Sequence, residues 1–390
     1  MMNIKETDKK YIAGTYGRFD LALVRGRGSL AYDENGKEYI DLGTGIAVNA
    51  FGIGDEEWKK AVESQLDAIP HASNLYFTEP CAHLAEMLCE KTGMSKVFFG
   101  NSGAEANECA IKAARKWGLV NKGEGYSTII TLKNSFHGRT ITTLAATGQD
   151  GFHTDFGPFT QGFVYADADN ADEVEKLASE NKCCAVMMEL VQGEGGIHVL
   201  SKEFVGRVLE IAKEKNLLVV IDEVQTGNGR TGELYAYMNY GFTPDIFTTA
   251  KGLGGGLPIG ACLFGEKTAD ILTPGSHGST FGGNPAACAG ACSILSRIDD
   301  GLLAGVKKKS EYIISQLENA KGVEDISGLG LMLGVKPVRP KAEVIDECMK
   351  NGVLVLGAKD KIRLLPALNI PDDLLEKGIE TLKKVLADCD

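Results

Sequence analysis

The 390-residue sequence predicts an α/β protein with a large, mostly parallel sheet covered by helices on both faces, followed by a smaller α+β domain. Strand-length apolar runs alternate with helical segments from about residue 96 to residue 264, which is typical of parallel sheets. The apolar run 217–221 ends at Asp222, as a buried parallel strand ends at its carboxyl edge. From about residue 298 the alternation changes to a helix, short strands and a last helix, which indicates a second unit.

The individual elements follow from apolar periodicity and from turn residues at their ends. We expect residues 1–50 to pack with the small domain, residues 51–297 to form the large domain, and residues 298–390 to form the small one. The predicted strands are 96–99, 126–132, 185–190, 217–221, 247–250, 258–264, 331–335, 352–356 and 361–365. The predicted helices are 56–66, 80–89, a segment through 117, 201–213, 286–295, 303–317 and 373–386.

The amino-acid composition argues against several classes of binding partner. The net charge of −12 argues against nucleic acid and against an acidic membrane surface. No apolar run approaches the roughly 20 residues of a membrane helix, and the first residues are polar, so we expect a cytoplasmic protein with no membrane partner. The ten cysteines include no C-x-x-C pair and the six histidines show no metal spacing, so we expect reduced thiols and no metal site.

Two neighbouring strand ends carry an acid and an amine. The run 217–221 delivers Asp222, and the run 247–250 delivers Lys251 into a glycine-rich segment. A desolvated lysine can act as a nucleophile on a carbonyl, and a buried carboxylate can hold a protonated ring nitrogen. Pyridoxal phosphate needs both groups. The same residues also fit a turn-capping aspartate and a surface lysine, so the remaining motifs must decide.

Phosphate-type turns occur twice. Strand 96–99 leads through Ser102, Gly103 and Ala104 into a helix, an arrangement that aims free backbone amides at a phosphate. The alternative is an ordinary helix start with Ser102 as its N-cap. Hydroxyls and glycines around Ser279 and Thr280 also suit a phosphate.

Other strand ends offer an aromatic ring, a guanidinium and a second acid. Strand 126–132 leads to Phe136, which could stack on a flat ring, and to Arg139, which could bind a carboxylate in a bidentate manner. The alternative is a core phenylalanine and a surface arginine. Strand 185–190 is followed by Glu194 among glycines.

Taken in order, these motifs resemble the class III, or ornithine-type, aminotransferases, which are pyridoxal phosphate enzymes of fold type I with the aspartate aminotransferase-like fold. The resemblance covers nearly the whole chain and rests on residues 101–106, 136–140, 191–196, 222–227, the Lys251 loop and residues 278–285. Residues 41–49 and 136–139 are most similar to the acetylornithine-type members.

The resemblance implies a role for each cofactor residue. Lys251 would bind pyridoxal phosphate as a Schiff base and then move a proton between the substrate Cα and the cofactor C4′, while Asp222 would pair with the ring nitrogen. Gln225 would contact the ring hydroxyl, and Phe136 would stack on the ring. Thr280 would reach the phosphate from a neighbouring subunit, which implies a homodimer with shared active sites. The expected cofactor-binding residues are Ser102, Gly103, Ala104, Phe136, Asp222, Glu223, Val224, Gln225, Lys251 and Thr280.

The resemblance also implies how two substrates share one site. Arg139, with Ser279 nearby, would hold the carboxylate of N2-acetyl-L-ornithine, and Arg363 would hold the α-carboxylate of 2-oxoglutarate or glutamate. Glu194 would pair with Arg363 while the amine donor is bound and release it for glutamate. The implied reaction moves the δ-amino group to 2-oxoglutarate and gives N-acetyl-glutamate semialdehyde and glutamate, a step of arginine biosynthesis.

The sequence departs from the family pattern at two places, and several alternative functions remain open. Residues 52–56 lack the Gly-His-x-His-Pro pattern frequent in the family, and Gly45 replaces a tyrosine that ornithine aminotransferases place near the substrate amine. Gly45 favours an acylated donor, yet succinylornithine, ornithine, 4-aminobutyrate and acetyl-lysine-type donors stay open. An aminomutase would share the fold. A non-catalytic nucleotide-binding protein is disfavoured because the sequence has no G-x-x-x-x-G-K-[ST] loop.

Overall fold

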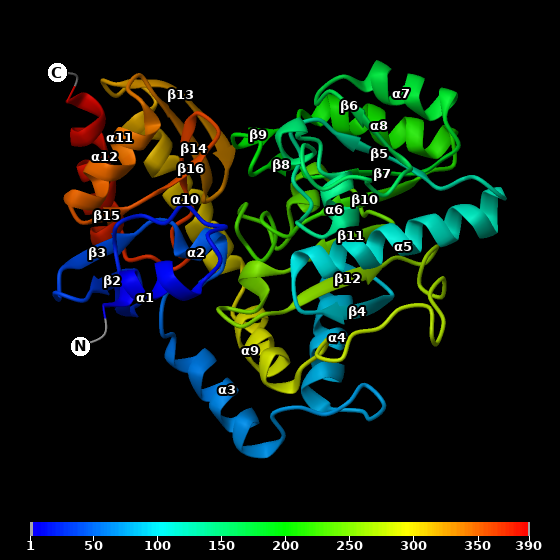
Figure 1. Cartoon of the computed structure of the whole chain (residues 1–390), viewed down its shortest axis with the longest axis horizontal. Coiled ribbons are helices and arrows are strands. Elements are labelled where there is room, and N and C mark those ends of the chain that lie inside the picture. The colour runs from blue at the N-terminus through cyan, green and yellow to red at the C-terminus, as the bar shows by residue number, and fades with distance from the viewer. Residues whose placement is uncertain (1–2, 389–390) are drawn as a thin grey trace.

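The computed structural model describes residues 3–388, which form two lobes (Figure 1). The larger lobe is built on a seven-stranded sheet with the order β4-β12-β11-β10-β7-β5-β6. Its strands are β4 (Lys96–Gly100), β5 (Thr128–Leu132), β6 (Phe163–Ala166), β7 (Cys183–Met188), β10 (Leu218–Asp222), β11 (Ile246–Thr249) and β12 (Gly260–Phe264). Five neighbouring strands run parallel, and β12 runs antiparallel to both β11 and β4. The sheet is therefore mostly parallel, as predicted.

Helices cover both faces of this sheet. Helix α5 (Gly103–Lys122) packs over one face, while α7 (Ala171–Glu180) and α8 (Lys202–Glu214) lie on the other (Figure 1). Helix α8 begins because the Ser201 hydroxyl accepts a hydrogen bond from the Phe204 amide, and its apolar stripe is buried. Helices α3 (Glu56–Ala68), α4 (Glu79–Thr92) and α9 (Pro285–Ser296) extend the lobe below the sheet.

The smaller lobe combines the C-terminal quarter of the chain with the N-terminal strands. Its main sheet is β13 (Val323–Leu329), β14 (Met332–Pro337), β17 (Lys361–Leu364) and β16 (Leu356–Ala358). Helices α10 (Asp300–Leu317), α11 (Lys341–Lys350) and α12 (Asp372–Ala387) pack on it. A second sheet joins β1 (Leu23–Arg27), β2 (Leu30–Asp33) and β3 (Glu38–Asp41) to β15 (Val353–Leu354), where Ile40 lies opposite Val353. The domain limits at residues 50 and 297 stay a prediction.

The predicted strand 352–356 is wrong as a single element. The structure divides it into β15, which pairs with β3, and β16, which pairs with β17 in the other sheet. Local periodicity cannot detect such a division, because each half takes its hydrogen-bonding partners from a different part of the chain.

Short elements complete the chain: α1 (Ile4–Tyr11), α2 (Thr44–Ala47), α6 (Ile141–Ala146), β8 (Val191–Gln192) and β9 (His198–Val199). Element α2 is a left-handed turn rather than a helix, with φ of 46° at Thr44, 63° at Gly45, 67° at Ile46 and 61° at Ala47. Two hydrogen bonds hold it: the Thr44 amide donates to Asp41 Oδ1, and Thr44 Oγ1 donates to the Leu365 carbonyl at 2.6 Å. Left-handed geometry is costly for residues with a Cβ, so these anchors are needed.

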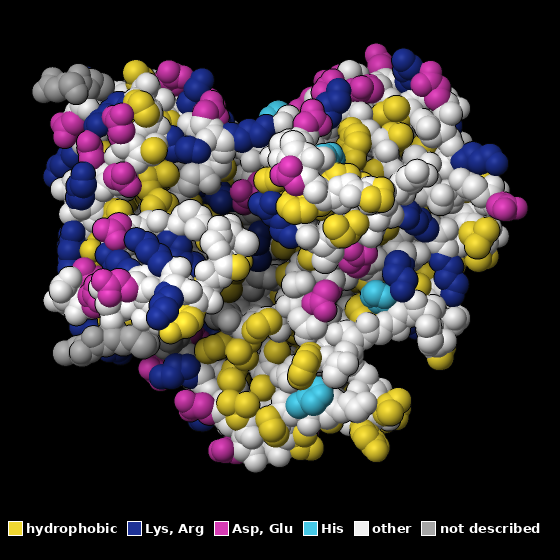
Figure 2. Space-filling model, viewed as in Figure 1, with side chains coloured by type: hydrophobic (Ala, Val, Ile, Leu, Met, Phe, Trp, Pro, Cys, Tyr) yellow, Lys and Arg dark blue, Asp and Glu magenta, His cyan; other side chains and the backbone are white. Residues whose placement is uncertain are grey.

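The surface is notched between the two lobes, and apolar side chains gather on the lower part of the large lobe in this view (Figure 2). Strongly exposed apolar residues in the segment after α3 and near α9 include Leu75, Tyr76, Phe77 and Phe281. No helix within residues 3–388 is long and apolar enough to cross a membrane.

Candidate active site

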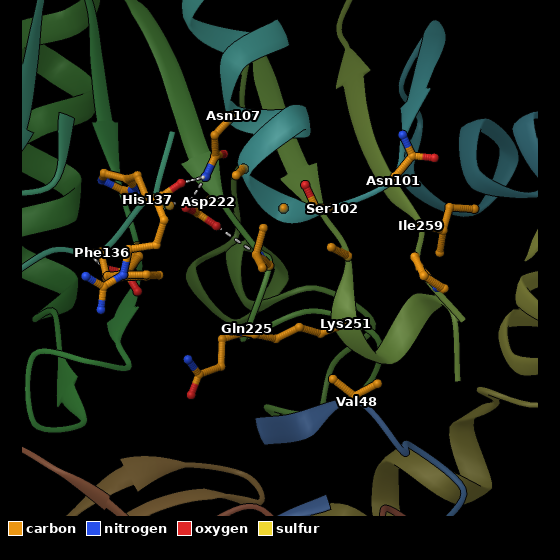
Figure 3. A pocket seen from close by; sticks show the side chains of 18 of the residues that line it. Val48, Asn101, Ser102, Asn107, Phe136, His137, Asp222, Gln225, Lys251 and Ile259 are labelled. Atoms are coloured by element: carbon orange, nitrogen blue, oxygen red, sulfur yellow. Dashed lines mark hydrogen bonds and ion pairs between the residues drawn. The ribbon is translucent and has the colours of Figure 1, made fainter. Parts of the chain in front are cut away.

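A cavity of about 440 Å³ opens at the carboxyl ends of β10 and β11, beside the start of α5 (Figure 3). Open α/β sheets bind their ligands at such strand ends. Its lining comes from the loop after β5, the ends of β7, β10 and β11, the start of α5 and the segment before β12. The lining residues include Val48, Asn101, Ser102, Gly103, Ala104, Asn107, Phe136, His137, Arg139, Glu189, Asp222, Val224, Gln225, Lys251 and Ile259.

Asp222, the last residue of β10, is buried and held by three donors. His137 Nδ1 and Asn107 Nδ2 both donate to its Oδ2 at 2.8 Å, and the Val224 amide donates to its Oδ1 at 3.0 Å. Asn107 is itself fixed by Thr248, whose hydroxyl donates to its Oδ1 at 2.7 Å. This hydrogen-bonded group, which we call the Asp222 network, joins α5, β10, β11 and the loop after β5.

The environment of the fully buried His137 favours its protonated form. Burial alone opposes protonation, but the hydrogen bond to Asp222 and the negative charge of that carboxylate outweigh it, so the pKa of His137 is raised above its usual value. Its other ring nitrogen, Nε2, is buried and has no hydrogen-bond partner among the described residues. Among the described residues, the imidazole ring therefore makes its only hydrogen bond to Asp222, and it affects the cavity through that carboxylate.

Lys251 lies two residues after the end of β11 and opens onto the same cavity. Desolvation lowers the pKa of its amine below the usual value, although the carboxylates of Glu194 and Asp222 oppose the shift. Its backbone is left-handed, with φ of 42°. A lowered pKa and a position in a cavity are what an amine nucleophile requires.

The start of α5 forms the opposite end of the cavity. Ser102 is its N-cap and accepts from the Glu105 amide at 3.2 Å, so the simpler interpretation of this serine is correct as well. The amides of Gly103 and Ala104 belong to the first turn, whose N–H groups have no intrahelical acceptor. A Cβ on Gly103 would lie 2.7 Å from Val224 Cγ1, so this close approach requires glycine.

Phe136 and Arg139 lie at the rim of the cavity. The guanidinium of Arg139 sits 4.1 Å from the ring centre of Phe152 and 5.5 Å from that of Phe136. Arg139 is exposed, whereas Phe136 is half-buried. The structure thus brings both residues to one side of the cavity, as the sequence predicted.

Arg363 and Glu194 meet in an ion pair between the two lobes. Arg363 Nη1, on β17, donates to Glu194 Oε1 at 2.5 Å and to Gln225 Oε1 at 3.1 Å. Arg363 is buried, and both charged groups act electrostatically on Lys251. The predicted pairing of these two residues is present in the structure.

Five predicted site residues are absent from the cavity lining of this chain: Glu194 and Arg363, which pair with each other near Lys251, and Glu223, Ser279 and Thr280. The side chain of Glu223 lies elsewhere: it accepts from Thr226 Oγ1 at 2.5 Å and from the Tyr237 amide at 2.8 Å, because successive residues at a strand end point to opposite sides. Burial raises the pKa of Glu223 to about 7. Ser279 and Thr280 lie outside the cavity lining, and Thr280 is exposed.

Sequence reasoning missed Asn107, His137 and Glu189 as part of the site. His137 belongs to the motif 136–140, and its burial beside a carboxylate could have been suspected from its place next to Phe136. Asn107 gives no local signal, since its partner Asp222 is 115 positions away. Glu189 follows the apolar run of β7, and nothing in the local pattern separates it from an ordinary polar residue at a strand end.

Comparisons with known proteins define the class. The model of the class-III aminotransferase family matches residues 11–386, so the chain belongs to this family. It is 48% identical over 387 residues to an acetylornithine aminotransferase of Haemophilus ducreyi, covering 99% of this chain and 98% of the relative. It is also 42% identical to a succinylornithine transaminase of Yersinia pseudotuberculosis, covering 97% of this chain and 95% of that protein.

Solved structures agree with this placement. An ornithine aminotransferase from Toxoplasma gondii aligns with a TM-score of 0.93 at 29% identity, covering 98% of this chain and 93% of that one, and is described with partial occupancy of pyridoxal phosphate at its active site. An N-acetylornithine aminotransferase from Stenotrophomonas maltophilia aligns with a TM-score of 0.84 at 34% identity, covering 98% of both chains. The protein is a pyridoxal phosphate-dependent aminotransferase with the fold of these enzymes.

The cavity fits that cofactor. Asp222 with its donors, the start of α5 at Ser102, Phe136 and Lys251 are arranged around the same cavity (Figure 3). These groups match the ring nitrogen, phosphate, aldehyde and ring face of pyridoxal phosphate.

Proposed function

We propose that this enzyme moves the δ-amino group of N2-acetyl-L-ornithine to 2-oxoglutarate, giving N-acetyl-glutamate semialdehyde and glutamate in arginine biosynthesis. The observation that carries the proposal is the Arg363–Glu194 pair beside Lys251. While Arg363 is paired with Glu194, the site suits an amine donor that has no second carboxylate at that position. When Glu194 releases Arg363, the free guanidinium suits a dicarboxylate acceptor. The names of the most similar relatives support the donor.

The chain's own residues supply binding, orientation and proton transfer. When bound, pyridoxal phosphate supplies an aldehyde that accepts the amino group and a ring that withdraws electrons. Asp222, fixed by His137 and Asn107, holds the ring nitrogen in its protonated form. Lys251, whose pKa is lowered by burial, takes the proton from the carbon that bears the transferred amine and returns it during transfer. This carbon is Cδ of the acylated donor and Cα of glutamate.

The donor side of the site is proposed to lie at the rim. Arg139 would bind the α-carboxylate of the acylated donor, because its guanidinium is exposed beside Phe136 and can form a bidentate contact. Gly45 does not line the cavity, but Val48, at the end of the same left-handed turn, does. A glycine at position 45 leaves open space there, because a Cβ at this position would meet only Asn49 and Val48, both at 3.9 Å.

We further propose a homodimer in which Thr280 and Ser279 complete the partner's phosphate and substrate sites. The turn that carries them is held by Asn74, which donates to the carbonyls of Ser279 and Gly282 at 2.9 and 2.8 Å. The neighbouring Tyr76 and Phe77 are strongly exposed apolar side chains, which are typical of a surface that another chain covers. The cytoplasmic location predicted from the sequence stays a prediction.

The test is a panel of amine donors assayed with 2-oxoglutarate. We expect kcat/KM to be highest for N-acetylornithine. A preference for free ornithine or 4-aminobutyrate would overturn the donor assignment, and a preference for succinylornithine would select the alternative that one relative suggests. Absence of glutamate among the products would point to an aminomutase.

A further inference from the structure

Glu189 is a buried carboxylate that the proposed reaction does not use. It follows β7 directly and lines the cavity, where 5% of its surface is exposed. Its two oxygens have different partners: Oε2 accepts from the Phe136 amide at 2.9 Å, and Oε1 accepts from the Gly193 amide at 3.3 Å. Each partner belongs to a separate loop of the site.

These two loops carry different functions. Phe136 stands against the cofactor region, whereas Gly193 directly precedes Glu194, the acid that pairs with Arg363. Gly193 is also packed so closely that a Cβ there would lie 2.4 Å from Gln225 Nε2, and Gln225 is the second partner of Arg363. The position of Gly193 therefore determines where Glu194 and Gln225 meet the arginine.

We propose that Glu189 is a positioning residue that fixes the Glu194 loop relative to Phe136 and so sets the balance between amine donor and 2-oxoglutarate. The inference rests on the proposed function of the Arg363–Glu194 pair. Without the hydrogen bond from Gly193, the loop is free to shift and Glu194 masks Arg363 less completely. The unmasked arginine then favours the dicarboxylate over the amine donor.

The chain offers a matched control in Glu223. It follows β10, the strand that pairs with β7, it is fully buried, and it likewise accepts hydrogen bonds from its surroundings. Burial raises the pKa of both Glu189 and Glu223 to about 7. Only Glu189 lines the cavity, so a substitution of Glu223 reports the general effect of altering a buried acid at a strand end.

The experiment compares Glu189→Gln with Glu223→Gln in the cofactor-loaded enzyme. Amide hydrogen exchange is measured over residues 134–140 and 191–196, and KM is measured for the amine donor and for 2-oxoglutarate. A glutamine offers a single acceptor oxygen, so at least one of the two amides loses its partner. We expect about 10-fold faster exchange in at least one of these two segments and a donor KM raised about 5- to 10-fold, with a smaller change for 2-oxoglutarate. Glu223→Gln is expected to produce neither effect.

Three results would overturn the proposal. The first is unchanged exchange in both segments, and the second is faster exchange in these segments that Glu223→Gln produces to the same extent. The third is an equal change in KM for the amine donor and for 2-oxoglutarate. If Glu189→Gln does not fold, Glu189→Asp retains the charge but shortens the reach, and the same two readouts apply. Failure of the donor assignment is seen separately, because wild type would then not turn over N-acetylornithine. The KM ratio is in that case measured with the donor that wild type uses, and the exchange test is unaffected.

Discussion

The cofactor side and the substrate side of the cavity are built in different ways. The cofactor side consists of the Asp222 network, whose members come from adjacent parts of one lobe and are buried together. The proposed substrate side draws Arg139 from a surface loop, Arg363 from the other lobe, and Ser279 from a turn that does not reach the cavity of its own chain.

This difference separates chemistry from specificity. Three donors hold the carboxylate of Asp222, and each lost hydrogen bond would leave a buried polar group unpaired, which makes this side of the cavity rigid. The substrate side has fewer fixed contacts, and its central ion pair joins two lobes. An enzyme that must accept an amine donor and a dicarboxylate in turn needs that freedom on the substrate side alone. Substitutions on the cofactor side should therefore affect both substrates equally, and those on the substrate side should affect one.

The largest effect is expected from Lys251→Ala. Loss of the amine removes both the covalent attachment and the proton transfer, so kcat should fall by on the order of 1,000-fold or more. Wild type should be labelled at Lys251 by pyridoxal phosphate and borohydride, whereas the variant should not. Labelling of the variant at the same stoichiometry would show that another lysine holds the cofactor.

Next in size is Asp222→Asn. The substitution keeps the shape but removes the charge that His137 and Asn107 surround, so kcat should fall about 100-fold for donor and acceptor half-reactions alike. Single-turnover absorbance changes with each substrate measure the two halves separately. A loss confined to one half-reaction would contradict the division between the two sides.

Arg363→Lys should change the KM of one substrate, 2-oxoglutarate, far more than the KM of the amine donor. Lysine cannot reproduce the planar contacts to Glu194 and Gln225, nor a bidentate grip on a carboxylate, so KM for 2-oxoglutarate should rise about 10- to 100-fold. The donor KM should change by less than about 3-fold. Steady-state kinetics with each substrate varied in turn provides the comparison, and equal increases would place Arg363 with the cofactor side.

The smallest effect concerns stability rather than rate. The pKa of Glu223 is raised from 4.5 to about 7 by burial, so its folded form prefers the proton. Its contribution to stability is thus fully present below pH 4.5 and is lost as the pH rises to about 7. Between pH 4.5 and about 7, the free energy of unfolding of wild type should fall by on the order of 3 kcal/mol or less relative to that of Glu223→Gln. Denaturant unfolding at each pH measures this difference. A constant difference across the window would show that folding does not raise the pKa of Glu223.

Sequence reasoning predicted the fold correctly and brought the proposed cofactor residues to one edge of the sheet, because both signals are local. Asp222, Lys251 and the turn at Gly103 each follow an apolar strand, so periodicity alone places them at one edge of the sheet. Asn107 and Glu189 were missed because their partners are distant in sequence or are backbone amides. The family resemblance implied Glu223 as a cofactor-binding residue, but the alternation of side chains at a strand end turns its side chain away from the cavity.

The close contact between Gly103 and Val224 also fixes the distance between the start of α5 and the carboxylate of Asp222. Val224 follows Asp222 by two residues, and Gly103 begins the helix whose amides face the other end of the cavity. Because the two segments touch with no room for a methyl group, the separation between the anion-binding end and the carboxylate end cannot adjust to the ligand. The cavity therefore discriminates by the span between a phosphate and a ring nitrogen, and it should reject pyridoxal analogues whose phosphate arm is longer by one methylene.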